Sequence, residues 1–135
     1  MSTQPRGLIR NREHAGQIRL FAGMRWGTIT PTDIDGLIDF GGEAFVIIET
    51  KYGDAKLPTG QRLALERLAD VISSTGRPCV ALVASHHSSG DIVVGECQVT
   101  ECQVTEYRFR GAWHAPRQPM TVCEAIEGFR KKHVT

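Results

Sequence analysis

Residues 32–51 read TDIDGLIDFGGEAFVIIETK and predict two short β-strands joined at Gly41-Gly42. The segment Ala44–Ile48 is apolar, rich in β-branched residues and bounded by glycines, and it is too short for a typical helix. This pattern indicates a strand inside a sheet. The more polar strand before it would pair with it as a β-hairpin.

Charged residues cluster along this hairpin. Glu49 and Lys51 stand two residues apart, so they share one face of the second strand. Three acidic residues share one face of the first strand: Asp33, Asp35 and Asp39. The length of the connecting loop determines whether the two sets lie on the same side of the sheet.

A two-residue turn at the glycines would place the two sets of acids on opposite faces. A three-residue loop, Gly41–Glu43, places Asp35 opposite Glu49, and it also places Asp33 opposite Lys51. Both loop lengths are common in hairpins. We predict the longer loop, because directly opposed residues have Cβ atoms roughly 4.5–5.5 Å apart, close enough for two carboxylates to hold one divalent cation.

Two carboxylates this close repel each other, and one would hold a proton unless a cation neutralised them. Carboxylate oxygens with no nearby histidine or cysteine favour magnesium or manganese over zinc. The neighbouring Lys51 could orient an attacking water or stabilise charge on a phosphate. The sequence therefore predicts a metal-dependent phosphodiesterase. The alternative is an edge hairpin with solvated charges.

Three motifs resemble the PD-(D/E)xK nuclease superfamily: Pro31–Gly36, Ile47–Lys51 and the Gly60-Gln61 pair that opens a helix. The resemblance covers about residues 10–85 and is nearest to small phage and repair nucleases and Holliday-junction resolvases. It implies a restriction-endonuclease-like core, which is an α/β fold with a mixed central sheet flanked by helices.

The resemblance also implies roles for individual residues. Asp35, Glu49 and the main-chain carbonyl of Thr50 would bind Mg²⁺, for which Mn²⁺ can substitute. Lys51 would act on the water or the phosphate, and Gln61 would orient the water or hold a phosphate. Thr32 interrupts the Pro-Asp pair of the family, so either Asp33 or Asp35 could be the ligand. The family's spacing and the predicted register favour Asp35.

The N-terminal region adds further candidates. Helical spacing of apolar residues predicts a helix from Asn11 to about Met24. Glu13 lies on this helix and is either an additional metal ligand or a solvated acid in the first turn. Arg12 and Arg19 are candidate phosphate contacts. Farther along the chain, Arg108 and Arg110 alternate with aromatic residues and form a second candidate basic surface, or an ordinary edge strand with outward charges.

The remaining elements are predicted from periodicity and capping signals. We expect a short strand over 25–30, a buried strand over 79–85 that is parallel to its neighbour, a strand-like region over 91–110 and a loop over 111–119. Thr59 should cap a helix ending near Ser74, with Leu65, Leu68 and Ile72 facing the core. Thr121 and Glu124 should form a capping box that opens a final helix.

The repeat over 96–105 should lengthen a hairpin, with a bulge or a reversal of faces between its two copies.

The length of 135 residues predicts one domain over 1–135. A net charge of +1 excludes a histone-like polycation, so any nucleic-acid contact must come from a local patch. The sequence shows no membrane span or signal peptide, and the cysteines should be reduced.

We therefore expect a magnesium-dependent nuclease that hydrolyses phosphodiester bonds in DNA, in the cytoplasm of a prokaryotic or phage-infected cell. It would use no organic cofactor and have no membrane partner. We expect a homodimer, because two copies would combine enough positive charge to hold DNA. The alternative is a nuclease-like fold that binds nucleic acid or protein without cutting.

Overall fold

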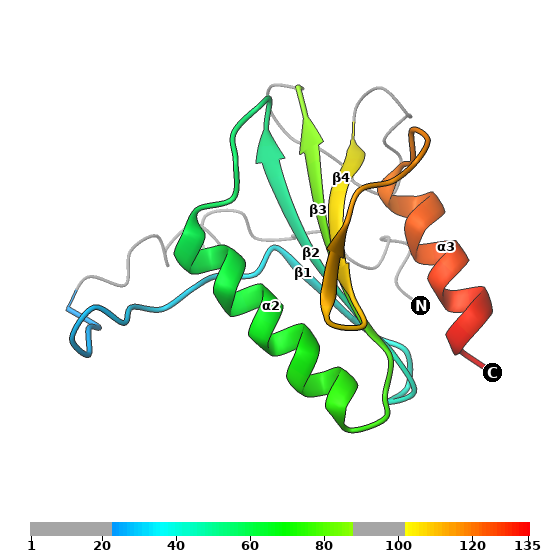
Figure 1. Cartoon of the computed structure of the whole chain (residues 1–135), viewed down its shortest axis with the longest axis horizontal. Coiled ribbons are helices and arrows are strands. Elements are labelled where there is room, and N and C mark those ends of the chain that lie inside the picture. The colour runs from blue at the N-terminus through cyan, green and yellow to red at the C-terminus, as the bar shows by residue number, and fades with distance from the viewer. Residues whose placement is uncertain (1–22, 88–101) are drawn as a thin grey trace, which may run out of the picture. The chain divides into compact units, whose positions relative to one another are not determined.

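A five-stranded mixed sheet forms the centre of residues 33–135, with the strand order β1-β2-β3-β4-β5 (Figure 1). The computed structural model describes residues 23–87 and 102–135. Its elements are β1 (Gly36–Asp39), β2 (Phe45–Tyr52), α2 (Thr59–Ser74), β3 (Cys79–His86), β4 (Gln103–Phe109), β5 (Ala112–His114) and α3 (Val122–His133). The predicted α/β class with a mixed sheet is confirmed.

The predicted register of the central hairpin is confirmed. Gly36 pairs with Ile48 and Asp39 pairs with Phe45. The connecting loop spans Gly41–Glu43, and both glycines in it adopt positive φ angles, 61° and 78°. A glycine takes this left-handed conformation without the steric cost that a side chain would impose. The loop therefore has the three residues that bring the acids toward one face.

The hairpin strand β1 is shorter than predicted. Its ladder with β2 begins at Gly36, so Asp33 and Asp35 precede the strand rather than standing on it. Asp39 accepts a hydrogen bond from the backbone N–H of Gly42 at 2.6 Å and so caps the loop. Only Asp35 therefore comes close to the end of β2, and it does so from an irregular segment.

A helical crossover connects β2 to β3, and the two strands run parallel, as predicted. Alternation along β2 and β3 sends one set of side chains toward α2 and the other toward α3. Ile47, Cys79 and Ala81 pack with Leu65 and Ala69 beneath α2. A larger cluster lies on the α3 side: Ala44, Val46, Val80, Leu82, Ala84, Cys102, Val104, Val122 and Phe129. The sheet therefore has a buried core on each face.

The helix α2 has the predicted bounds, but two details differ. Pro58, not Thr59, occupies the N-cap position, and no side chain caps the helix there. Leu68 is 38% exposed, and Ala69 takes its place in the core. The inward-facing stripe runs from Gln61 through the apolar positions 65, 69 and 72, where spacings of three or four residues keep side chains on one face.

The strand β5 was not predicted, because residues 111–119 read as a loop. Arg110 and Gly111 form a tight turn between β4 and β5, with φ angles of 51° and 78°. Two consecutive positive φ angles match the twist of a hairpin, but arginine is unusual in that position. The β3–β4 register also shifts at one point and leaves Thr105 as a bulge. The first copy of the repeat lies outside the described residues.

The final helix α3 begins with the predicted capping box. The Thr121 side chain accepts a hydrogen bond from the Glu124 backbone N–H, and the Glu124 carboxylate accepts one from the Thr121 N–H. Val122 and Phe129 are buried against the sheet. Ala125 and Ile126 pack against the same cluster.

Residues 23–32 contain no strand, so the strand predicted over 25–30 is wrong. A tight turn with an isolated bridge between Trp26 and Ile29 stands in its place, with Gly27 at φ 67°. The predicted N-terminal helix lies outside the described residues except for Gly23 and Met24, which are not helical. Across 23–87 and 102–135, no helix is long and apolar enough to cross a membrane.

Candidate active site

Glu49 is the most deeply buried acidic side chain near the end of β2, with 3% of its surface exposed. It faces the α2 side of the sheet with Lys51, two residues farther on. The Lys51 Nζ lies 3.2 Å from Glu49 Oε1. The other carboxylate oxygen, Oε2, is buried and has no hydrogen-bond partner among the described residues. This oxygen is available to a cation or a water, because burying a carboxylate oxygen unpaired is costly.

The pKa of Glu49 is raised above its usual value by burial and by the nearby Asp35 carboxylate. Hydrogen bonding from Lys51 and Gln61 and the charge of Lys51 act in the opposite direction. Burial has the largest effect because water no longer solvates the charge. A cation at this position would remove the repulsion between the two carboxylates and favour the ionised form.

Asp35 reaches β2 at Thr50. Its Oδ2 accepts hydrogen bonds from the Thr50 backbone N–H at 2.8 Å and from the Thr50 hydroxyl at 3.0 Å. The β1–β2 ladder has already ended at Gly36, so this carboxylate satisfies a backbone donor that a longer strand would have paired. The interaction fixes Asp35 beside Glu49. Asp33 is exposed and lies before β1.

Gln61 lies in the first turn of α2 and is half-buried. It stands four residues before the buried Leu65, so it points to the sheet on the same side as Glu49. Its amide interacts with the Glu49 carboxylate and lowers the pKa of that group. The structure therefore brings Asp35, Glu49, Lys51 and Gln61 together, from three separate segments of the chain.

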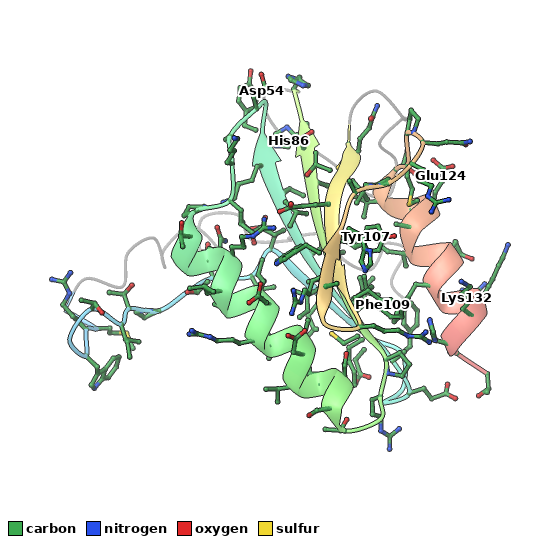
Figure 2. The ribbon with its side chains drawn as sticks, in the orientation of Figure 1. Asp54, His86, Tyr107, Phe109, Glu124 and Lys132 are labelled. Atoms are coloured by element: carbon green, nitrogen blue, oxygen red, sulfur yellow. The ribbon has the colours of Figure 1, made fainter. Side chains whose placement is uncertain are left out.

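A cavity of about 550 Å³ adjoins Lys51 at the carboxyl ends of β2 and β3. Figure 2 shows Asp54 and His86 at this end of the sheet. The cavity is lined by Lys51, Gly53, Asp54, Ala55, Lys56, Leu57, Arg62, Val83, Ala84, Ser85, Thr105 and Glu106. Three basic side chains and two acidic ones surround it, together with the hydroxyls of Ser85 and Thr105. A cavity with this lining can accept a polar, anionic group next to Lys51.

The donor atoms at this end of the sheet suit a hard cation. Glu49 offers the unpartnered Oε2, and Asp35 is the second carboxylate. In the described part of the chain, no group of three or more histidine, cysteine and acidic residues is placed to hold a metal. Two carboxylates are enough for magnesium, which commonly keeps several waters and binds one or two protein carboxylates together with substrate phosphate. The residues present therefore fit Mg²⁺ or Mn²⁺.

A network of ion pairs and hydrogen bonds, called here the polar ladder, connects α2 to the β4–β5 hairpin next to this site. It was not predicted from the sequence. From α2, Arg62, Glu66 and Asp70 lie on one face at four-residue spacing. Arg62 pairs with Glu106 and stacks over the Trp113 ring at 4.2 Å. The four-residue spacing of these charged residues was the available signal.

The polar ladder also includes the indole N–H of Trp113 and the side chain of Arg108 on β4. The Trp113 indole N–H donates to Glu66 at 2.8 Å. Arg108 forms two hydrogen bonds with Asp70, at 2.7 and 3.1 Å, and lies 3.5 Å from Glu66. These interactions connect α2, which carries Gln61, to both strands of the β4–β5 hairpin.

The candidate phosphate-binding arginines divide into two groups. Arg108 faces α2, and its side chain is only 12% exposed. Arg110 lies in the β4–β5 turn, stacks over Phe109 at 5.1 Å and lines a cavity beside α3. The two arginines therefore lie on opposite faces of the sheet and do not form the single basic side expected from alternation. The candidates Arg12, Arg19 and Glu13 lie outside the described residues.

Comparisons of this chain with protein-family models, with curated proteins and with solved structures found no match.

Proposed function

We propose that this protein is a magnesium-dependent nuclease that hydrolyses phosphodiester bonds in DNA, built on a restriction-endonuclease-like core and acting in the cytoplasm of a prokaryotic or phage-infected cell. The observation that carries the proposal is the buried carboxylate of Glu49, whose Oε2 has no partner in the described residues although Asp35 and Lys51 stand beside it. If Glu49 and Lys51 formed only a structural ion pair, we would expect both carboxylate oxygens of Glu49 to have partners. Two carboxylates beside a lysine, with one oxygen unpaired, suit a site that binds a cation and a phosphate.

Asp35 and Glu49 would hold the cation, with the main-chain carbonyl of Thr50 as a further oxygen ligand. When bound, Mg²⁺ supplies an activated water and neutralises charge on the phosphate. The hydrogen bonds from Thr50 hold the Asp35 carboxylate in place without consuming the buried oxygen of Glu49. Asp35 is favoured over Asp33 because only its charge raises the pKa of Glu49.

Lys51 has two roles in this proposal. In the absence of metal, its ammonium group compensates the buried charge of Glu49 across 3.2 Å. With substrate present, the same group faces the cavity, where it would stabilise negative charge on the phosphate or assist the attacking water. Gln61 would orient that water through its amide. The ladder of α2 with β4 and β5 keeps Gln61 at the correct distance from Glu49.

The test is a cleavage assay on single-stranded, duplex and branched DNA and on RNA, with magnesium, with manganese and with chelator. We expect metal-dependent cleavage of DNA by the native chain and none by Glu49→Gln. Absence of cleavage of every substrate with either metal would overturn the proposal. Retained DNA binding under those conditions would instead support a catalytically silent binding module.

A further inference from the structure

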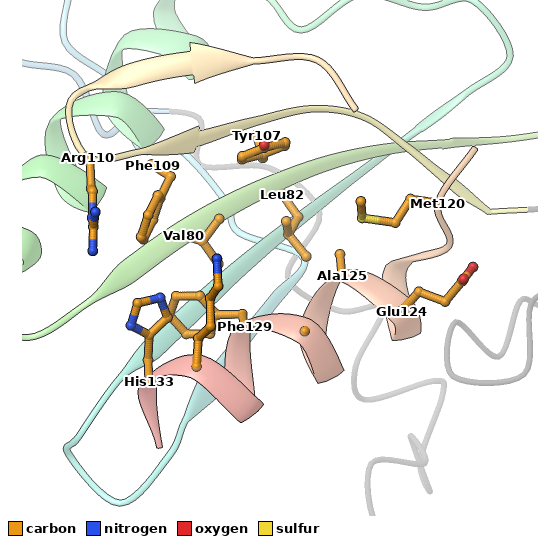
Figure 3. A pocket seen from close by; sticks show the side chains of 12 residues that line it. Val80, Leu82, Tyr107, Phe109, Arg110, Met120, Glu124, Ala125, Phe129 and His133 are labelled. Carbon is orange, nitrogen blue, oxygen red and sulfur yellow. The ribbon is translucent and has the colours of Figure 1, made fainter. Parts of the chain in front are cut away.

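We propose that the groove between α3 and strands β3 and β4 binds a small amphipathic anion, namely a flat aromatic ring system that carries a carboxylate or phosphate group. The groove has a volume of about 560 Å³, within the range of small-molecule sites. Val80 and Leu82 form its floor, and Tyr107, Phe109 and Phe129 form its walls (Figure 3).

This site is separate from the proposed nuclease centre. Glu49 and Lys51 project to the α2 face of the sheet, whereas Val80 and Leu82 project to the α3 face. The two sites therefore use alternate residues of neighbouring strands and have no lining residue in common. A ligand in the groove would not occupy the space beside Lys51.

The aromatic rings of the groove are arranged around an edge-to-face pair. Phe109 and Phe129 are 6.3 Å apart at 89°, and His133 lies 4.8 Å from Phe129 and 5.6 Å from Phe109. Such rings offer both faces and edges to a further ring, which prefers offset-stacked or edge-to-face contact. The walls therefore suit a flat aromatic group better than a branched aliphatic one.

One end of the groove carries three basic side chains: Arg110, Lys132 and His133. Among the described residues, no carboxylate lies within ion-pair distance of any of them. Burial lowers the pKa of His133, and the charges of Arg110 and Lys132 lower it further. Basic groups crowded in this way beside an apolar surface attract an anion, because it relieves their mutual repulsion.

The opposite end of the groove is less suited to an anion. Glu124 lines it, and its carboxylate caps the backbone N–H of Thr121. A ligand would therefore orient with its charged group toward Arg110 and its ring toward Met120 (Figure 3). The charge difference between the two ends fixes this direction.

Isothermal titration of the full chain with 2-naphthoate tests the proposal, with uncharged 2-naphthalenemethanol as the matched ligand. We expect saturable one-to-one binding of the anion and at least tenfold weaker binding of the alcohol, since the alcohol cannot make a charge-assisted contact with the basic end of the groove. Adenosine monophosphate, titrated in parallel, distinguishes a nucleotide from a carboxylate ligand by which of the two anions binds more tightly. Failure of both anions to bind would overturn the proposal, as would equal affinity for the alcohol.

Two variants locate the site. Gly128 lines the groove, and an added Cβ there meets no atom within 4 Å, so Gly128→Leu fills the groove from a helix that gains propensity. We expect Gly128→Leu to abolish binding while α3 remains folded by circular dichroism. Lys132→Gln should weaken 2-naphthoate binding about tenfold, whereas Lys131→Gln, which lies outside the groove, should not. Unchanged binding in Gly128→Leu would place the ligand elsewhere and refute the site.

Discussion

At the scale of single residues, Glu49 combines deep burial with a charge that its surroundings only partly compensate. Asp35 raises its pKa, Lys51 and Gln61 lower it, and burial exceeds both effects. A group with a raised pKa in the folded state destabilises the fold once it ionises. In Glu49, a function that needs a negative charge therefore conflicts with the stability of the metal-free protein.

The first prediction is that Glu49→Gln abolishes cleavage and raises the melting temperature of the metal-free protein at pH 7. The stability difference should appear as pH rises above 4.5, the ordinary pKa of the side chain, and should disappear at lower pH, where the native Glu49 is already neutral. Thermal unfolding of both proteins from pH 4 to pH 8 measures this difference.

Magnesium provides the complementary control. At a hundred times its dissociation constant it should stabilise the native protein by about 2.7 kcal/mol and leave Glu49→Gln unaffected. Equal stabilisation of both proteins would show that the cation binds away from Glu49.

The second prediction concerns Lys51, which lies 3.2 Å from Glu49 and faces the cavity. Lys51→Ala should lower kcat about a hundredfold or more, the usual cost of losing one electrostatic contact to a transition state. Because Lys51 lowers the pKa of Glu49, the acidic limb of the pH–rate profile should move to higher pH in this variant. Lys131→Ala, an exposed lysine on α3, is the matched control. Near-native activity in Lys51→Ala would make Lys51 only a structural partner of Glu49.

At the scale of secondary-structure elements, the ladder between α2 and the β4–β5 hairpin positions the site. Arg108 is its centre, because it contacts both Glu66 and Asp70 with a side chain that is 12% exposed. Breaking a partly buried, two-bond ion pair leaves polar groups without partners. The position of α2, and with it the position of Gln61, therefore depends on contacts made 38 to 47 residues away in sequence.

The third prediction is that Arg108→Ala lowers the free energy of unfolding by about 1–3 kcal/mol, whereas Arg67→Ala on the exposed side of α2 changes it little. The Arg108 guanidinium lowers the pKa of Asp70, so the stabilisation should be fully present above pH 3.8 and be lost as pH falls through the lowered pKa of the folded state. Urea unfolding at pH 7 and pH 3 measures both effects. A loss in Arg108→Ala that is the same at both pH values would contradict the role of Asp70.

At the scale of the whole molecule, the nearly neutral charge makes DNA binding by one copy difficult. The net charge is +1, and Arg108 is engaged with acidic residues rather than facing solvent. Affinity for phosphates rises with the number of free basic groups, since each phosphate neutralised contributes about −0.9 to the logarithmic salt slope.

The fourth prediction is that the protein acts on DNA as a homodimer, which would double the basic groups along one binding surface. Light scattering at micromolar concentration should give a protein mass of twice 14.9 kDa in the complex, after the mass of the bound DNA is subtracted. A monomer with and without DNA that still cleaves would rule out the dimer and leave the nuclease proposal intact.

Features that depend on local backbone geometry and on side-chain periodicity could be predicted from the sequence. The loop Gly41–Glu43 set the register of the central hairpin, and the crossover through α2 made β3 parallel to β2. The capping box of Thr121 with Glu124 started α3 where it was expected. The hairpin loop and the capping box are each encoded within a few neighbouring residues, whereas the parallel pairing follows from the long helical connection between β2 and β3.

The tertiary structure established which side chains meet across the sheet. It buried Glu49, engaged Arg108 with α2 and placed Arg110 on the opposite face. It also ended β1 at Gly36, so that Asp35 bonds to Thr50 from an irregular segment. These outcomes depend on solvent exclusion and on pairings between distant segments. Periodicity cannot predict them, because it records the face of each residue and not the partner that covers it.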